Sequence, residues 1–288
     1  MSLSEEVVWI TGASSGIGEA LAGAFLREGA RVILSGRRVD ELHRVAAQAP
    51  ERTLVLPFDT TDYNALPEVV QGAWAWQGRV DRLINNAGVS QRSLALDTRF
   101  EVYRQLIEVD YLAPVALTQL LLPLMVQRRS GQIAVVSSVA GKVGVPLRSG
   151  YCGAKHAVVG YFEALRAEVS EAYGIQVSVI LPGSVQTSVA VNALEGDGTS
   201  RGRSDTNIDN GMPVDVAAGI ILAGLKANQR EIPVADGREA AALHLRVHDP
   251  ERLATATALE GARLARAREE AGAGSSLDPS DVQKLELP

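Results

Sequence analysis

The sequence predicts an α/β fold in which helices cover both faces of a doubly wound parallel β-sheet. Short apolar runs of strand type alternate with longer helical patterns along most of the chain, as expected of parallel strands joined by crossover helices. The first run is apolar throughout, which is typical of a strand buried on both faces. With 288 residues, 46% of them hydrophobic, the chain can bury a large core in a single domain.

The elements follow from these patterns in chain order. Runs rich in Val, Ile and Leu that end in polar turns predict strands at 7–10, 31–35, 54–56, 82–84, 132–137, 176–181 and 231–235. Apolar residues at helical spacing predict helices at 20–27, at 39–49, after a capping Asp62, and at 100–128, 151–172 and 213–227. Gly29 closes the first helix, and Pro114 is expected to kink or interrupt the long one.

Two segments lie outside this alternation. Residues 188–212 shift to Gly, Ser, Asp, Asn and Arg and are interpreted as a substrate lid, with a plain linker as the alternative. The end of the chain is rich in Ala, Arg and Glu and is expected to be helical up to residue 271, with a break before Pro250, and disordered beyond. Its leucines are too sparse for a core, so it is expected to dock on the domain or on another subunit. The predicted division is 1–237 for the domain and 238–288 for this C-terminal extension.

Composition excludes several classes of partner. A net charge of −6 without a basic run argues against nucleic acid. The single cysteine, Cys152, excludes an intrachain disulfide and fits a reducing compartment. The acidic N-terminus is not typical of a signal peptide, and the apolar stretch 111–126 is too short and too broken by proline for a membrane span. A cytoplasmic protein with no membrane partner is expected.

The turn after the first strand, Thr11-Gly12-Ala13-Ser14-Ser15-Gly16-Ile17-Gly18, is typical of a dinucleotide-binding loop because it lies between a strand and a helix. Gly12 would permit the tight turn, Gly16 the approach of a pyrophosphate, and Gly18 close packing of helix on strand. The phosphates would lie at the helix N-terminus. An ordinary Gly/Ser loop is the alternative. The candidate cofactor residues here are Gly12, Ser14, Ser15, Gly16, Ile17 and Gly18.

The end of the second strand favours NADP(H) over NAD(H). An acidic residue there would accept from the 2′-OH of NAD, but this chain has Gly36 followed by Arg37 and Arg38. Two guanidinium groups suit a 2′-phosphate, although the arginines could merely begin the next helix. After the third strand, Asp59, with Thr60 beside it, could accept from the adenine amino group.

The turn after the fourth strand, Asn85-Asn86-Ala87-Gly88, is expected at the same edge of the sheet. Asparagine side chains there can brace neighbouring strand ends, and Gly88 leaves room for a ribose. Asn86, Ala87 and Gly88 are therefore candidate cofactor residues.

Ser138, Tyr151 and Lys155 form the candidate catalytic group. Ser138 follows the fifth strand, at the edge where open α/β sheets bind ligands. Tyr151 and Lys155 are four apart in a helical stretch, so both project from one face. A phenol is a poor acid or base at neutral pH, and a neighbouring ammonium favours its ionised form. With a serine hydroxyl beside it, such a pair could protonate a ketone oxygen as hydride reaches its carbon. A chance meeting of Tyr and Lys at the surface is the alternative.

His244 and His248 are also four residues apart, a spacing compatible with a metal pair. No third ligand stands near them in the sequence, so no metal site is expected.

Taken together, the motifs resemble those of the short-chain dehydrogenases/reductases. The resemblance covers residues 7–237 and rests on motifs in the family's order: Thr11-Gly12-x-x-x-Gly16-x-Gly18, Asn85-Asn86-Ala87-Gly88, Ser138, Tyr151-x-x-x-Lys155 and Pro182-Gly183. Residues 142–169 are also similar to the subgroup of dehydrogenase/reductase member 7 and its bacterial relatives.

The resemblance implies a Rossmann fold and an NADP(H)-dependent oxidoreductase that interconverts a small-molecule carbonyl and an alcohol. Tyr151 would be the general acid/base, Lys155 would favour its ionised form and bind the nicotinamide ribose, and Ser138 would orient the substrate oxygen. The residues that would border the nicotinamide are Pro182, Gly183, Val185 and Thr187. A homodimer or homotetramer built on the helices at 100–128 and 151–172 is also implied.

Asp110 departs from the family's pattern. The family's long helix usually carries an Asn there, which helps to hold a water that links the lysine to solvent. If the role needs mainly a backbone carbonyl and a bend, Asp110 can serve as the fourth catalytic residue. A carboxylate near Lys155 would instead compete for its charge. This leaves an alternative function, an NADP-binding regulatory or scaffold protein with weak or lost catalysis.

Overall fold

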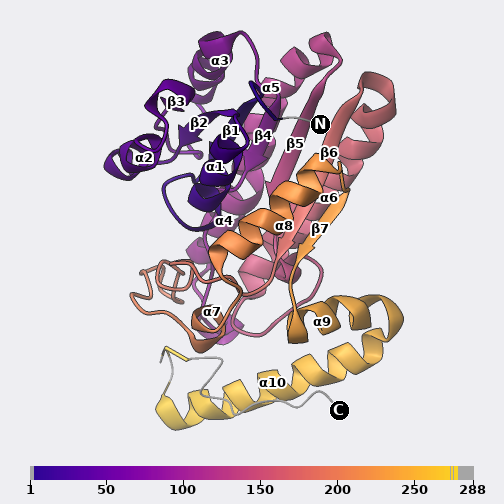
Figure 1. Ribbon diagram of the computed structural model, residues 1–288. Coiled ribbons are helices and arrows are strands. Elements are labelled where there is room, and N and C mark those ends of the chain that lie inside the picture. The colour runs from indigo at the N-terminus through magenta and orange to yellow at the C-terminus, as the bar shows by residue number, and fades with distance from the viewer. Residues whose placement is uncertain (1–2, 273, 275, 278–288) are drawn as a thin grey trace.

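A single parallel sheet forms the centre of the protein in a computed structural model that describes residues 3–272, 274, 276 and 277. Over these residues the sheet has seven strands in the order β3-β2-β1-β4-β5-β6-β7, and all neighbours run parallel. The strands are β1 (Val7–Thr11), β2 (Arg31–Ser35), β3 (Thr53–Val55), β4 (Arg82–Asn85), β5 (Gly131–Val136), β6 (Ile175–Pro182) and β7 (Glu231–Val234). The order reverses between β1 and β4, the switch point at which such sheets bind ligands. The predicted doubly wound sheet is confirmed (Figure 1).

Helices cover both faces of the sheet, as predicted. One face carries α1 (Gly16–Arg27), α2 (Val39–Ala46) and α8 (Val214–Lys226), and the other carries α3 (Leu66–Gln77), α5 (Ala113–Arg128) and α6 (Ser149–Tyr173). Phe25 and Ile221 lie in the apolar core of the first face, and Leu117 and Phe162 in that of the second. All four side chains are buried, so the strands are covered on both sides.

The long helix predicted over 100–128 is interrupted one turn before Pro114. It consists of α4 (Phe100–Ile107), a π-helical turn (Glu108–Leu112) and α5. Pro114 has no N–H for the carbonyl of Asp110, four residues earlier, so the regular bonding pattern cannot continue there.

The helical run Phe100–Arg128 is, among the described residues, the one helix long and apolar enough to cross a membrane by length and composition. The apolar stretch at 111–126 that looked too short therefore belongs to a longer helix. A core helix meets the same criterion, and Leu117 and Leu121 of this run lie in the core, so the finding is weak evidence for a span.

The C-terminal extension forms two helices, α9 (Gly237–His248) and α10 (Pro250–Ala271), which lie across one end of the sheet (Figure 1). Asp249 accepts from the N–H of Arg252 and caps α10, and Pro250 occupies its first turn, which explains the predicted break. Leu253 packs near Val139 and Val143, so the extension docks on the domain. The disorder expected beyond residue 271 falls largely outside the described residues.

Candidate active site

Three glycines shape the turn after β1. Gly12 and Gly16 have φ angles of +65° and +58°, in the left-handed region that favours glycine. A Cβ at Gly18 would lie 2.4 Å from the carbonyl oxygen of Gly12, so α1 packs closely on the end of β1 only with glycine there. α1 begins at Gly16, before the predicted start at residue 20, and the side chain of Ser15 makes no capping hydrogen bond. The N-terminal N–H groups of α1 therefore suit an anion.

The carboxyl ends of β1 and β4 are tied together through Thr11 and Asn86. The Asn86 Nδ2 donates to the carbonyl oxygens of Thr11 and Gly12 at 2.9 and 3.2 Å. The Thr11 hydroxyl accepts from the N–H groups of Asn86 and Ala87 at 3.0 and 3.1 Å. The expected bracing by asparagine is confirmed, and it holds the turn at 85–88 against the glycine turn at the switch point.

Arg38 is directed toward the glycine turn. Its Nη2 donates to the hydroxyls of Ser14 and Ser15 at 2.9 and 2.6 Å. It also occupies the N-cap position of α2, so it does adjoin the next helix. Arg37 is 79% exposed at its side chain and lies 3.7 Å from the Asp59 carboxylate. The end of β2 thus presents the Arg38 guanidinium beside two hydroxyls and the Arg37 guanidinium at the surface.

Two acids occupy the turn after β3. Burial opposes ionisation of Asp59, but hydrogen bonds from Thr61 and the charge of Arg37 outweigh it and hold the pKa of Asp59 below its usual value. Thr60 lines a small hollow beside the ends of β1 and β4. The prediction that Asp62 caps the next helix is wrong. α3 begins only after Ala65, and Asp62 accepts from the Ala65 N–H at 3.4 Å, which closes the preceding turn instead.

Ser138 lies just after the end of β5, and Tyr151 lies near the start of α6. The Ser138 hydroxyl donates to the carbonyl oxygen of Pro182 at 3.2 Å and accepts from the N–H of Ala140 at 3.1 Å. Tyr151 and Lys155 lie in the first turns of α6, which begins at Ser149, slightly earlier than predicted. The Nζ of Lys155 is 5.6 Å from the centroid of the Tyr151 ring, so a cation stands close to the phenol.

Lys155 is buried against a carboxylate from the π-helical turn. Its Nζ lies 3.3 Å from Asp110 Oδ1 and donates to the carbonyl of Val136 at 3.0 Å. Asp110 Oδ1 also accepts from the Val89 N–H at 3.0 Å, while its Oδ2 has no hydrogen-bond partner within the described chain. Burial alone would lower the pKa of Lys155, but the nearby Asp110 carboxylate outweighs this effect and raises it. For Asp110, burial raises the pKa. A Cβ at Gly88 would lie 2.7 Å from Asp110 and 3.2 Å from Lys155, so glycine fits here.

Gln91 caps the helix that carries Tyr151. Its Oε1 accepts from the N–H groups of Gly150 and Tyr151 at 2.9 and 3.2 Å. Its Nε2 donates to the hydroxyls of Ser93 and Thr98, both at 3.1 Å, and the side chain is fully buried. The sequence analysis missed this residue, because a glutamine in a polar loop carries no signal of a cap nearly sixty residues along the chain.

Of the predicted nicotinamide-side residues, Pro182 ends β6, and the other three lie in the loop that follows, beside the glycine turn. The Thr187 methyl group would be 3.2 Å from a Cβ at Gly16. Val185 is buried and pairs with Met212, at the far end of the predicted lid. The Gly183 N–H donates to the carbonyl of the last residue of β7 at 3.0 Å. The loop therefore joins the glycine turn, the lid and the edge of the sheet.

Residues 188–212 are packed on the domain, unlike a loose linker. Leu194 exchanges two backbone hydrogen bonds, at 2.8 and 2.9 Å, with the loop after β4. From that same loop, Arg92 forms an ion pair of 2.8 Å with Asp205, and the two side chains are 2% and 0% exposed. The sequence analysis interpreted this polar segment as a lid or a linker, and it missed the buried pair because nothing in the sequence links Arg92 to Asp205.

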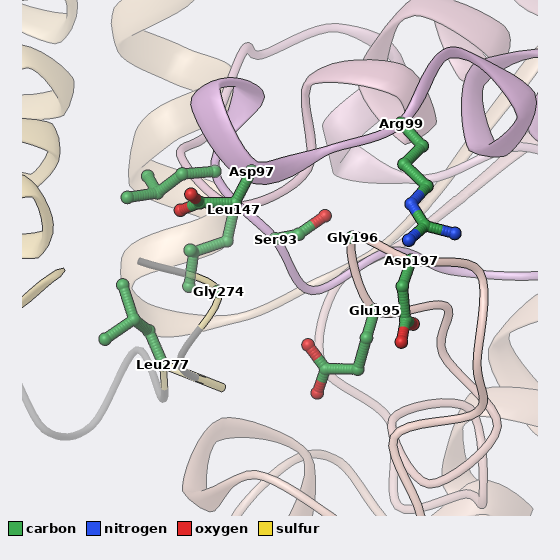
Figure 2. A pocket seen from close by; sticks show the side chains of 10 residues that line it. Ser93, Asp97, Arg99, Leu147, Glu195, Gly196, Asp197, Gly274 and Leu277 are labelled. Carbon is green, nitrogen blue, oxygen red and sulfur yellow. The ribbon is translucent and has the colours of Figure 1, made fainter. Parts of the chain in front are cut away.

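A cavity of about 280 Å³ lies between this segment and the C-terminal extension (Figure 2). Its lining residues are Ser93, Leu94, Asp97, Arg99, Leu147, Glu195, Gly196, Asp197, Gly274 and Leu277. Its three carboxylates already have partners. Asp97 is paired with Arg268, Glu195 accepts from Ser276, and Asp197 accepts from Thr199. The cavity thus has a polar wall with partnered carboxylates and an apolar wall at Leu147 and Leu277.

The histidine pair of α9 does not assemble a larger cluster. The rings of His244 and His248 lie 4.2 Å apart at their centroids. Among the described residues, no group of three or more His, Cys, Asp or Glu side chains is placed to hold a metal ion.

Sequence comparison places the chain among known proteins. A family model described as short chain dehydrogenase matches residues 6–198. The human protein named dehydrogenase/reductase SDR family member 7 is 40% identical over 241 residues, which cover 81% of this chain and 71% of that protein.

Two solved structures share the fold. A short chain dehydrogenase/reductase from Burkholderia phymatum in complex with NAD matches with a TM-score of 0.77 at 21% identity, covering 87% of this chain and 96% of that one. A short chain dehydrogenase from Burkholderia cenocepacia in complex with NADP matches with a TM-score of 0.74 at 23% identity, covering 88% and 97%. One holds NAD and the other NADP, so the choice between the two cofactors has to be argued from the residues of this chain.

Proposed function

This chain belongs to the short-chain dehydrogenase/reductase family, and from that premise we propose that it is an NADP(H)-dependent enzyme that interconverts a carbonyl compound and an alcohol. Membership establishes an oxidoreductase with a nicotinamide cofactor. One observation carries the finer proposal: a buried Lys155 ammonium stands 5.6 Å from the ring of Tyr151 at the ligand-binding edge of the sheet. A phenol beside a fixed cation is an acid/base suited to carbonyl chemistry.

The residues at the switch point fit a dinucleotide. The glycine cradle has no room for side chains: a Cβ at Gly12 would lie 2.9 Å from the Cα of Ala87. Gly12 and Gly16 would border the pyrophosphate, Lys155 would bind the nicotinamide ribose, and Thr187 would adjoin the nicotinamide. When bound, the cofactor supplies or accepts a hydride.

Arg38 supports NADP(H) as the cofactor. Its guanidinium already lies within hydrogen-bonding distance of the Ser14 and Ser15 hydroxyls, so three donors converge near the end of β2. A 2′-phosphate accepts several charge-assisted hydrogen bonds, whereas a 2′-hydroxyl needs an acidic partner that Gly36 cannot supply. Arg37 adds a second positive charge at the surface of this site.

The remaining chemistry belongs to three side chains. In the reducing direction Tyr151 would donate its phenolic proton to the carbonyl oxygen, and in the oxidising direction it would take that proton back. Lys155 would stabilise the phenolate by its charge. The Ser138 hydroxyl, which now donates to the Pro182 carbonyl, would turn to the substrate oxygen and donate to it as charge develops there.

One observation favours the second candidate function, an NADP-binding regulatory or scaffold protein with weak or lost catalysis. The carboxylate of Asp110 lies 3.3 Å from Lys155 Nζ and opposes part of the charge on which Tyr151 depends.

Turnover separates the two candidates. We expect loss of NADPH absorbance when the protein meets a panel of ketones, aldehydes and 3-oxoacyl compounds, and much slower loss with NADH at the same concentration. Tight binding of NADPH with no turnover on any member of the panel would favour the scaffold.

We also propose that the protein is a homodimer or homotetramer built on α4, α5 and α6. Phe100 is 70% exposed, and Leu112 and Leu120 are each 37% exposed, along this helical run. Apolar side chains of this kind are commonly covered in an assembly. Light scattering on the purified protein gives the mass and tests the proposal.

A further inference from the structure

The C-terminal extension contacts the loop after β6 through Glu239, in the first turn of α9. The Ser184 N–H donates to both carboxylate oxygens of Glu239 at 2.9 Å, and the Ser184 hydroxyl donates to Oε1 at 2.6 Å. Hydrogen bonds to an ionised acceptor are about twice as strong as neutral ones. Ser184 is therefore held firmly by a residue from outside the predicted domain.

Gly183 makes room for this contact. A Cβ at Gly183 would lie 2.2 Å from Glu239 Oε2 and 2.7 Å from its Cδ. Since the φ angle of Gly183 lies outside the left-handed region, backbone conformation does not require glycine here. A side chain at 183 would instead displace the Glu239 carboxylate from Ser184.

The same short loop is fixed at three further points. The Ser138 hydroxyl donates to the carbonyl of Pro182 at 3.2 Å. The Gly183 N–H donates to the carbonyl of Val234 at 3.0 Å, and the Ser184 carbonyl accepts from Met212 at 2.9 Å. Glu239 thus completes a set of anchors that comes from the turn after β5, from β7, from the segment 188–212 and from α9.

We propose that Glu239 is a positioning residue for the nicotinamide end of the cofactor. It fixes Ser184 and, through it, the loop 182–185 against which the nicotinamide would lie, an inference that rests on the proposed NADP(H)-dependent function. A loop ordered beforehand binds its ligand without an added ordering cost. Without Glu239, the free energy needed to order this loop would reduce the binding free energy of the complete dinucleotide.

The adenosine end would be held by residues other than those of the loop 182–185 and should not depend on Glu239. Arg38 and Ser14 lie at the ends of β2 and β1, and Ser184 follows β6. In the strand order β2-β1-β4-β5-β6, β2 and β6 are separated by four strand spacings, about 19 Å. A ligand that contains only the adenosine half therefore reports on the adenosine end alone.

Calorimetric titration with two ligands tests the inference. NADPH occupies both ends, whereas adenosine 2′,5′-bisphosphate has the adenine, the ribose and the 2′-phosphate but no nicotinamide. For Glu239→Ala we expect the Kd for NADPH to rise about tenfold, as loss of a hydrogen bond to a charged group predicts, and the Kd for the bisphosphate to stay within about twofold. Glu239→Gln keeps one acceptor oxygen and should restore much of the affinity for NADPH.

Arg246→Ala is the matched control. Its Nε donates to the carbonyl of Lys142 at 3.1 Å, so this variant loosens the docking of α9 without touching the loop. We expect wild-type affinity for both ligands. The inference fails if Glu239→Ala binds NADPH like the wild type, if both ligands weaken equally, or if Arg246→Ala weakens NADPH as much. A wild-type chain that binds neither ligand would overturn the proposed function, and the inference with it.

Discussion

The ammonium of Lys155 lies 3.3 Å from the carboxylate of Asp110, and the two side chains are 5% and 0% exposed. Taking both charges out of water is costly, and their attraction offsets that cost only when the remaining polar atoms are also satisfied. Here Asp110 Oδ2 has no hydrogen-bond partner within the described residues. The Asp110 carboxylate therefore keeps Lys155 charged, but its own negative charge opposes the effect of that ammonium on the neighbouring Tyr151.

Replacing this carboxylate by the neutral amide is expected to speed turnover. In Asp110→Asn the amide oxygen can still accept from the Val89 N–H, but the negative charge is gone. The Lys155 charge then acts on Tyr151 without opposition and favours the phenolate. We expect kcat for alcohol oxidation at neutral pH to rise by about tenfold. An unchanged or lower kcat would show that Asp110 matters more for keeping Lys155 charged than for opposing that charge.

Arg38 is expected to select the cofactor. Arg38→Leu removes the guanidinium beside Ser14 and Ser15 and with it a charge-assisted bond to a 2′-phosphate. We expect the Kd for NADPH to rise about tenfold to a hundredfold, with the Kd for NADH changed by less than about twofold. Arg37→Leu should have a smaller effect, because Arg37 is 79% exposed. Equal losses for both cofactors in Arg38→Leu would contradict the assignment.

The buried pair of Arg92 and Asp205 is expected to hold the segment 188–212 on the domain. Arg92→Leu leaves the buried Asp205 carboxylate without its 2.8 Å partner, and among the described residues only Arg201, at 3.7 Å, remains as an ion-pair partner. Removing one member of a buried pair typically costs about 3–5 kcal/mol of unfolding free energy. We expect the thermal midpoint to fall by about 10 °C, measured by circular dichroism. Arg99→Leu, an exposed arginine nearby, serves as the control and should change the midpoint little.

The docking of α10 is expected to weaken in acid. The hydrogen bond from Arg268 lowers the pKa of Asp97 below its usual value, which outweighs the opposing effect of burial. A carboxyl whose pKa is lower in the folded state stabilises the fold above its unfolded pKa, and this contribution disappears as the pH falls through the folded value. We expect Arg268→Ala to lower the thermal midpoint by about 2 °C above about pH 5, and the difference from wild type to shrink only as the pH falls below about 4, toward the lowered pKa of Asp97. A difference independent of pH would contradict this.

Much of the fold could be predicted because its signals are local. An apolar run predicts a strand buried on both faces, and the spacing of Gly12, Gly16 and Gly18 predicts the tight turn that the structure shows. Pro114 predicted an interruption, and the π-helical turn lies directly before it. The positions of Ser138, Tyr151 and Lys155 at the sheet edge follow in the same way, while their roles in catalysis stay predictions.

The features that were missed depend on contacts between residues far apart in the chain. Glu239 lies in a C-terminal extension that was expected to dock, but the sequence does not show that this residue bonds to Ser184. Asp205 seemed to belong to a polar segment, yet it is buried against Arg92. Polar side chains show no periodic pattern when their partners come from other elements, so only the assembled sheet reveals them.

The most direct test of the proposed function compares Tyr151→Phe with the wild type in two assays on the same samples. One follows loss of NADPH absorbance with the best carbonyl substrate of the panel, and the other measures the Kd for NADPH. The phenyl ring keeps the packing but has no proton to donate, so we expect turnover to fall by at least about a hundredfold while the Kd stays within about threefold. Turnover that survives in Tyr151→Phe would contradict the assignment of Tyr151 as the general acid/base.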